Sequence, residues 1–454
     1  MIASAANKEI SDQNAPGAIG RNLIWMVWSG GISIANSILV WVFMARMREP
    51  EELGRFTIVM GLYTLFYSVC TLGLMPYLVS EITRRNEQRK ALQKSEQTVV
   101  EFVGTASFFL LISGIICAVL MSAGGFLLNE SWQERVSAIV LSFALIPTGL
   151  IVVGEATAIS FDRTRLIAFV STFENTLRTI FPLWLIWAGF DISFVCLSFV
   201  LVRFIALAIY GWVVRRRFSN LTINRDDLIT ILKVTPTFAA TIIFASINWQ
   251  AAVILLGLFS TEIESAKFGV ASRFLIPVTI LMAGYAGAVQ PVITQQTQKS
   301  IESAGFYLAK MAGYPLIFST FAAAASPFLS QQVLIVFFGE KYADVAPTLD
   351  ILALSVIPFC LVMVIARGLV AVNSQHVDLW ANILGVAAFF AIGVALVPQH
   401  GASGAASAQL FSFLVMAVVE IGYVSKKIAG FNFWRKASLS LAGLLVFYAI
   451  IWNQ

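Results

Sequence analysis

The chain consists largely of apolar stretches long enough to cross a lipid bilayer, and this pattern leaves few folds open to it. A membrane-spanning helix needs about 20 consecutive apolar residues. By that measure we expect about 13 transmembrane helices, near residues 22–45, 56–79, 102–128, 136–161, 166–189, 191–214, 231–258, 268–294, 305–329, 349–372, 377–398, 402–424 and 436–453. The sequence therefore predicts an all-α polytopic membrane protein.

The composition agrees with this assignment. Hydrophobic residues make up 58% of the chain and charged residues 12%, against about 45–50% and about 25% in ordinary soluble domains. The most charged stretches, 80–101 and 215–233, are predicted to be loops. The first apolar run is too long for a signal-peptide core and no small-residue cleavage site follows it, so we expect it to stay as a helix.

The placement of basic residues predicts the orientation. Most of the 30 lysines and arginines lie in the segments that share a side with the N-terminus, which the positive-inside rule assigns to the cytoplasm. They are not gathered with aromatic residues on one polar face, so nucleic acid is not an expected partner. The four cysteines lie within apolar runs and only two histidines are present, so we expect no disulfide framework, metal site or cofactor.

An internal repeat divides the chain. Glu52-Leu-Gly-Arg-Phe56 parallels Glu264-Ser-Ala-Lys-Phe268, and the same shift carries Asn36 onto Asn248. Repeats related by an axis along the membrane normal are typical of transporters whose substrate route lies between the halves. The expected parts are an N-terminal six-helix lobe, a cytoplasmic linker, a C-terminal six-helix lobe, and a basic loop with one more helix, at 1–214, 215–230, 231–425 and 426–454. Chance similarity between two amphipathic helix starts is the alternative.

Four arginines lie inside the apolar stretches, namely Arg178, Arg203, Arg273 and Arg367. An arginine at bilayer depth costs at least about 3 kcal/mol, so each should face the protein interior or a water-filled cavity. Arg178 and Arg203 lie near the middle of their segments, where the side chain cannot easily reach the membrane surface. The pattern indicates a polar pathway through the membrane.

Acidic residues offer partners for two of these arginines. Glu174 and Arg178 are four residues apart, which places them on one helical face. They form either a structural ion pair or part of a site for a charged substrate or protons. Arg203 has no acid within a helical turn, so its partner must come from another helix, for example Glu155, or from a ligand. Arg273, Glu155, Arg367 and Glu420 lie nearer helix ends, where an interfacial role is the alternative.

Uncharged polar residues form a second candidate group. Asn36 on the first helix would face Asn248 and Gln250 on the seventh if these two helices meet across the repeat axis. Amide side chains of this kind either bind sugars or hold helices together. The chain has no Walker phosphate loop, HExxH or GxSxG motif and no large outer loop, so we expect neither catalytic residues nor an enzyme.

Four stretches resemble segments of a known family. They are Ala45–Phe56, Lys267–Leu275, Phe338–Pro347 and Pro398–Gln409. In this order they are similar to the corners after the first and seventh helices and to the segments before the tenth and twelfth helices of the Wzx-type polysaccharide and O-antigen flippases. These proteins form a branch of the multidrug/oligosaccharidyl-lipid/polysaccharide (MOP) exporter superfamily. The resemblance spans most of the chain, and its motifs are mainly structural.

The resemblance implies two six-helix bundles related by a pseudo-twofold axis along the membrane normal, together with a C-terminal helix. It also implies a flippase of the bacterial inner membrane that moves a polyprenyl-diphosphate-linked oligosaccharide to the outer leaflet. This step would serve envelope polysaccharide or lipopolysaccharide assembly, together with other membrane proteins of glycan assembly. Arg178, Arg203 and Arg273 would then bind the diphosphate, which suits the planar guanidinium. Asn36, Asn248 and Gln250 would face the glycan. Many relatives have an aspartate in the seventh helix where this chain has Asn248, which argues against ion coupling there.

Two other functions stay open from the sequence. One is a cation-coupled small-molecule exporter of the same superfamily, although such an exporter should have an acidic cavity and the intramembrane charge here is mainly basic. The other is an integral membrane enzyme of glycan assembly.

Overall fold

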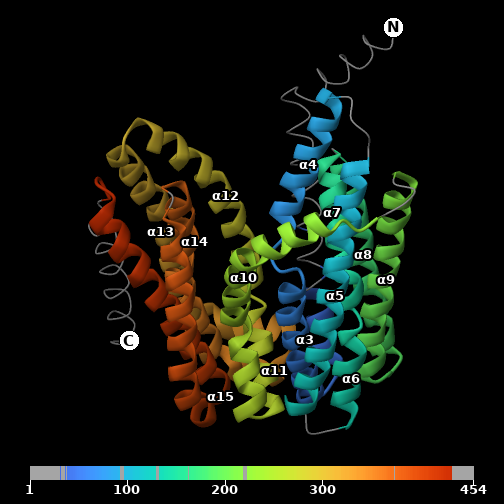
Figure 1. Ribbon diagram of the computed structural model, residues 1–454. Coiled ribbons are helices and arrows are strands. Elements are labelled where there is room, and N and C mark those ends of the chain that lie inside the picture. Colours follow the sequence, from blue (N-terminus) through green and yellow to red (C-terminus); the bar gives the residue numbers. More distant parts are fainter. Residues whose placement is uncertain are drawn as a thin grey trace. The chain divides into compact units, whose positions relative to one another are not determined.

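The structure is a computed structural model of the chain, and it describes residues 31, 36, 38–92, 97–128, 132–161, 163–217, 222–372 and 374–431. Apart from short turns, these residues are helical (Figure 1). Nine of their helical stretches are long and apolar enough to cross a membrane. The prediction of an all-α polytopic membrane protein is therefore confirmed. The predicted helix 436–453 and most of helix 22–45 lie outside the described residues.

The chain folds into two compact units. Among the described residues, the first unit comprises those up to Phe43 together with Phe66–Ile242, and the second comprises Met44–Leu65 and those from Ile243 to Phe431. Two helices, α3 (Pro50–Cys70) and α10 (Arg225–Phe259), each contribute residues to both units. The two units are therefore divided within α3 and within α10. The division into lobes at 1–214 and 231–425 stays a proposal from the repeat.

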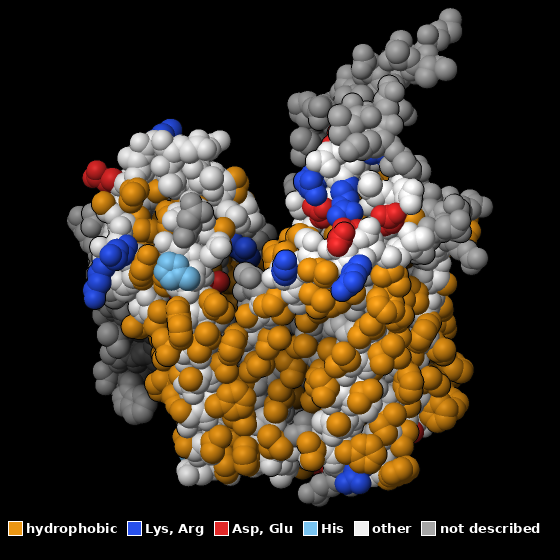
Figure 2. Space-filling model, viewed as in Figure 1, with side chains coloured by type: hydrophobic (Ala, Val, Ile, Leu, Met, Phe, Trp, Pro, Cys, Tyr) orange, Lys and Arg blue, Asp and Glu red, His pale blue; other side chains and the backbone are white. Residues whose placement is uncertain are grey.

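In the first unit, the end of α3 leads into six further helices, which are α4 (Met75–Leu92), α5 (Gln97–Leu128), α6 (Trp132–Ser142), α7 (Leu145–Ser160), α8 (Thr164–Trp187) and α9 (Ile192–Arg217). Glycines allow α5 and α7 to pack closely, because a Cβ on Gly149 would lie 2.4 Å from the Leu110 carbonyl oxygen. Figure 2 shows hydrophobic side chains over most of the face of this unit that is in view, as expected for a surface in contact with lipid.

The charged segment 80–101 was predicted to be a loop, and this is wrong. Helix α4 runs on to Leu92 and α5 begins at Gln97. Glu81 pairs with Arg84 at 2.6 Å and with Arg85 at 2.7 Å, at helical spacings of three and four. Such pairs let a helix continue into water beyond its apolar part. Similarly, α9 extends to Arg217 and α10 begins at Arg225, inside the second predicted loop.

The second unit contains most of α3, the second part of α10, and further elements that are helical throughout. They are α11 (Glu262–Ser272), α12 (Leu275–Lys299), α13 (Ile301–Phe338), the 3₁₀ helix η1 (Glu340–Val345) and α14 (Ala346–Ala371), followed by α15 (Gln375–Lys427). Helix α15 consists of two arms that meet at Gly401, which has φ 52° and ψ −126°. The break between the predicted helices 377–398 and 402–424 is confirmed at this position.

Three of the four stretches that carry the family resemblance are linked by polar contacts within the second unit, and the fourth is bonded to Glu264, just before the second stretch. The Arg46 guanidinium donates to the carbonyl of Phe337 at 2.9 Å, and the Lys341 ammonium donates to the carbonyl of Arg48 at 2.6 Å. Lys267 pairs with Asp344 at 2.8 Å. The carboxylate of Glu264, in the repeated motif, accepts from the backbone N–H of Ala402 at 2.8 Å, next to the turn at Gly401.

The two segments that carry the predicted repeat lie against each other. Arg55 of the first motif pairs with Glu262, beside the second motif, at 3.1 Å. A Cβ on Gly54 would collide with the Glu262 backbone, so the close approach of these two segments requires glycine.

Although burial opposes the charged form, hydrogen bonds to Asp344 and Glu264 raise the pKa of Lys267 above its ordinary value. These contacts join α3, α11 and η1 within this unit.

Candidate functional site

The first unit holds a buried charge cluster in the apolar parts of α8 and α9. Arg203 on α9 is 5% exposed and pairs with Glu174 on α8 at 2.9 Å. Arg178 pairs with the same Glu174 at 3.6 Å, across one helical turn. Two arginines therefore share one carboxylate, and the closer partner of Arg203 comes from a neighbouring helix, as the sequence required.

Aromatic rings complete the surroundings of the two guanidinium groups. The Arg203 guanidinium carbon lies 4.9 Å from the ring centroid of Tyr67, and that of Arg178 lies 5.2 Å from the ring of Phe199. Each ring presents a negative face to the cation. The Arg178 side chain is 19% exposed and the Arg203 side chain is 6% exposed, so Arg178 is the more accessible of the pair.

Glu155 on α7 is half-buried and lies within electrostatic range of both Arg203 and Glu174. It is not the acid in the closest contact with Arg203, a position that Glu174 occupies. Counting only these two acids and the two arginines, the cluster is neutral when both acids are ionised and carries one positive charge when Glu155 is protonated. The net charge of these four groups therefore depends on whether Glu155 is protonated.

The remaining arginines lie in the second unit. Arg273 caps the end of α11, and its Nε donates to the Gly269 carbonyl at 3.3 Å. Arg367 lies near the end of α14 and is exposed, with an electrostatic influence on Asp378. The structure thus brings together Arg178 and Arg203 but places Arg273 and Arg367 in the other unit.

The amide candidates also occupy different environments. Asn248 on α10 is 2% exposed, accepts from the Ser412 hydroxyl at 2.9 Å and donates to the Met416 sulfur at 3.0 Å. These bonds join α10 to the second arm of α15. Gln250 is half-buried in the same unit, and Asn36 is half-buried in the first unit. Asn248 accordingly holds helices together in this structure.

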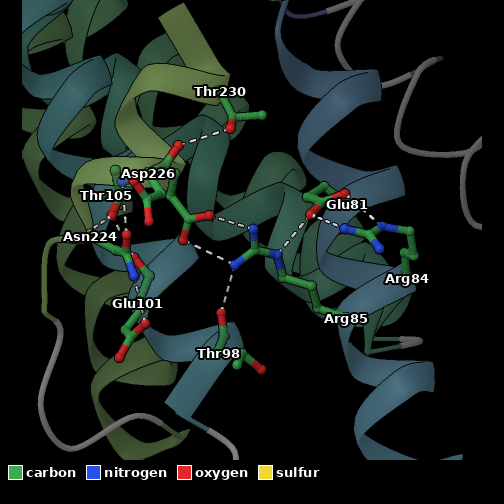
Figure 3. Close-up of polar contacts among 10 residues, drawn as sticks. Glu81, Arg84, Arg85, Thr98, Glu101, Thr105, Asn224, Asp226 and Thr230 are labelled. Carbon is green, nitrogen blue, oxygen red and sulfur yellow. Dashed lines mark hydrogen bonds and ion pairs between the residues drawn. The ribbon is translucent and has the colours of Figure 1, made fainter.

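A polar cluster at the ends of α4 and α5 was missed by the sequence reasoning (Figure 3). Arg85 on α4 donates from Nη1 to Asp227 on α10 at 3.0 Å and to the Thr98 carbonyl at 3.0 Å. Its guanidinium also lies 4.5 Å from the ring centroid of Phe102. The only available signal was a run of charged residues, which by itself names no partner.

Asn224 completes this attachment of α10 to the first unit. Its backbone N–H donates to the Thr105 hydroxyl at 2.9 Å, and its side-chain amide donates to Glu101 at 3.0 Å. Its side-chain oxygen accepts from the N–H of Asp226 at 2.9 Å, which caps the start of the helix. The start of α10 is therefore fixed to α4 and α5.

Solved structures of membrane transporters share this fold. The chain is 15% identical to a structure described as the lipid II flippase MurJ in an inward closed conformation, with a TM-score of 0.72 and coverage of 94% of this chain and 92% of that one. It is 14% identical to an inward-facing multidrug resistance MATE family transporter of the MOP superfamily, with a TM-score of 0.66 and coverage of 87% and 94%. No curated protein sequence matches the chain.

The family itself is shown by the sequence. A family profile described as "Polysaccharide biosynthesis protein" matches residues 19–297, which is more than half of the chain. The matched range includes the first two of the four resembling stretches, and the match agrees with the fold shared with the MOP-superfamily transporter. The chain is therefore a multi-pass membrane protein that belongs to the polysaccharide biosynthesis protein family, the family of the Wzx-type flippases.

Proposed function

We propose that the protein is a flippase that moves a polyprenyl-diphosphate-linked oligosaccharide from the cytoplasmic to the outer leaflet of a bacterial inner membrane, with its N-terminus in the cytoplasm. Membership of the polysaccharide biosynthesis family and the fold shared with a lipid II flippase support this function. The oligosaccharide and diphosphate would cross through the protein by alternating access while the lipid tail stays in the bilayer.

The observation that carries the proposal is the pair of arginines that share Glu174 within an apolar helix hairpin. A diphosphate presents several acceptor oxygens, and guanidinium groups bind such oxygens through paired hydrogen bonds. Arg178 is the first contact in this proposal because it is more exposed and its bond to Glu174 is longer. Arg203 would bind next, exchanging part of its contact with Glu174 for phosphate.

The other candidates take subsidiary roles in this proposal. Arg273 would attract the head group from the second unit, and Gln250 and Asn36 would contact the glycan. Asn248 can contact the glycan only by leaving Ser412 and Met416. A cation-coupled small-molecule exporter is the competing function, because a multidrug transporter of the same superfamily shares the fold.

The test uses vesicles that carry a fluorescent polyprenyl-diphosphate oligosaccharide and the purified full-length protein. Leaflet exchange should be fast with the wild type and strongly reduced in Arg178→Gln, which keeps the Glu174–Arg203 pair. Arg84→Gln is the matched control, because Arg84 lies outside the charge cluster and its side chain is 55% exposed. Absence of exchange with the wild type, with and without imposed ion gradients, would support the exporter instead.

A further inference from the structure

The second unit contains a completely buried carboxyl group that has no ion-pair partner among the described residues. Glu420, on the second arm of α15, is 0% exposed. Within the described part of the chain, neither of its carboxyl oxygens receives a hydrogen bond. Glu174, by contrast, is 8% exposed and pairs with Arg203 at 2.9 Å. An ionised carboxylate without such a partner is strongly unfavourable in an apolar interior.

The Glu420 side chain interacts with a second carboxyl group. Asp378, on the first arm of α15, lies within hydrogen-bonding reach of Glu420. Its own side chain accepts from the Asn382 amide at 3.0 Å. The two acids lie on opposite arms of the hairpin, far along the chain from Gly401. They therefore close the open end of the hairpin.

The other charged and polar groups around this pair do not supply the missing donor. Arg367 on α14 acts on Asp378 electrostatically, but its side chain is exposed. The ring of His376 packs edge to face on that of Tyr423, and the Tyr423 hydroxyl lies 3.3 Å from that of Ser374. None of these groups is bonded to Glu420 among the described residues.

Two ionised carboxylates can only accept hydrogen bonds, and they repel each other. One proton between them removes the repulsion and creates an O–H···O bond, as in other close carboxyl pairs. We propose that Asp378 and Glu420 form a proton-binding site that holds one shared proton at neutral pH and thereby joins the two arms of α15. The proton belongs to the pair as a unit and not to either residue alone.

Loss of this proton would act on one end of the hairpin. Nearer the middle, the Ser412 hydroxyl donates to the Gly385 carbonyl at 2.8 Å, and Gly385 packs against Met416. These contacts contain no titratable group and would persist. Deprotonation would therefore separate only the ends of the arms that carry Asp378 and Glu420. This inference does not depend on the transported substrate.

Infrared spectroscopy of the purified full-length protein tests the site directly, because a protonated carboxyl group has a carbonyl stretch that a carboxylate lacks. Near pH 7 the wild type should show this band, and Glu420→Gln should lose it, since Asp378 would then ionise beside an amide. Asp378→Asn should shift the band, because the protonated Glu420 loses its carboxylate acceptor. Glu340→Gln, at an exposed carboxylate of the same unit, is the matched control and should leave the band unchanged.

The pH dependence of stability gives a second measurement. A proton held more tightly in the folded than in the unfolded state makes stability fall as pH rises. The melting temperature of the wild type should therefore decrease between about pH 6 and about pH 9, and that of Glu420→Gln should decrease less. A carboxyl band unchanged in both Glu420→Gln and Asp378→Asn, or identical pH profiles for wild type and Glu420→Gln, would overturn the proposal.

Discussion

Replacement of Glu174 by glutamine should be among the most destabilising single substitutions in the first unit. The change removes the carboxylate that Arg203 contacts at 2.9 Å, and Arg203 is 5% exposed. Breaking a buried ion pair from one side costs about 3–5 kcal/mol, because the remaining charge stays buried. Removal of Arg178 instead should cost at most about 1 kcal/mol, since its contact is 3.6 Å long and its side chain is partly exposed.

The double variant Glu174→Gln, Arg203→Met distinguishes an ion pair from mere packing. Replacing both charges with uncharged groups is often close to neutral, so the double variant should recover most of the loss. The coupling energy from the double-mutant cycle should be about 2–3 kcal/mol. Additive effects of the two substitutions would refute the argument that Glu174 stabilises Arg203.

The four cysteines provide the probe for this experiment. Cys70, Cys117, Cys196 and Cys360 are all reduced and buried. A thiol-reactive fluorophore therefore labels them as the protein unfolds in mixed detergent micelles. The free energy of unfolding can then be compared between variants under identical conditions.

Three further predictions concern the fold. Arg85→Ala should lower the free energy of unfolding by about 2–3 kcal/mol, because Arg85 bonds charged and backbone groups on three helices. Arg84→Ala should have little effect. Equal effects of the two substitutions in unfolding titrations would contradict this prediction. Gly401→Ala should lower the free energy of unfolding by at least about 1–3 kcal/mol, because the φ of Gly401 is positive. Gly422→Ala should be nearly neutral, because a Cβ there meets no atom within 4 Å. A Gly401→Ala protein as stable as the wild type would refute the prediction of backbone strain at this position. Lys267→Met should cost about 1 kcal/mol or less because its partners are partly exposed. Because the pKa of Lys267 is raised in the folded state, its ammonium group stays charged between about pH 6 and about pH 9. The stabilisation from its ion pairs should therefore be constant across this range, and it should be lost only as pH rises through the folded-state pKa.

Much of the fold was determined by the sequence alone. Apolar length predicted the helices, and the break between the predicted helices 377–398 and 402–424 was confirmed at Gly401. The spacing of Glu174 and Arg178 predicted a contact on one helical face, and the structure has it at 3.6 Å. These features are local, because they depend on the composition and periodicity of a single segment.

The local signal failed where helices leave the membrane. Charge density predicted loops at 80–101 and 215–233, but Glu81, Arg84 and Arg85 pair along α4 and let the helix continue. A charged composition alone does not separate a solvated helix from a loop, since both contain few apolar residues.

Partners between helices were decided by the tertiary structure. Arg203 required an acid from elsewhere, and only the packing of α8 against α9 identified Glu174. In the same way, packing buried Asn248 against Ser412 and brought Asp378 beside Glu420 from opposite arms of α15. The sequence places charges at a depth where each needs a partner, and that partner depends on which helix faces touch, a relation that no single segment encodes.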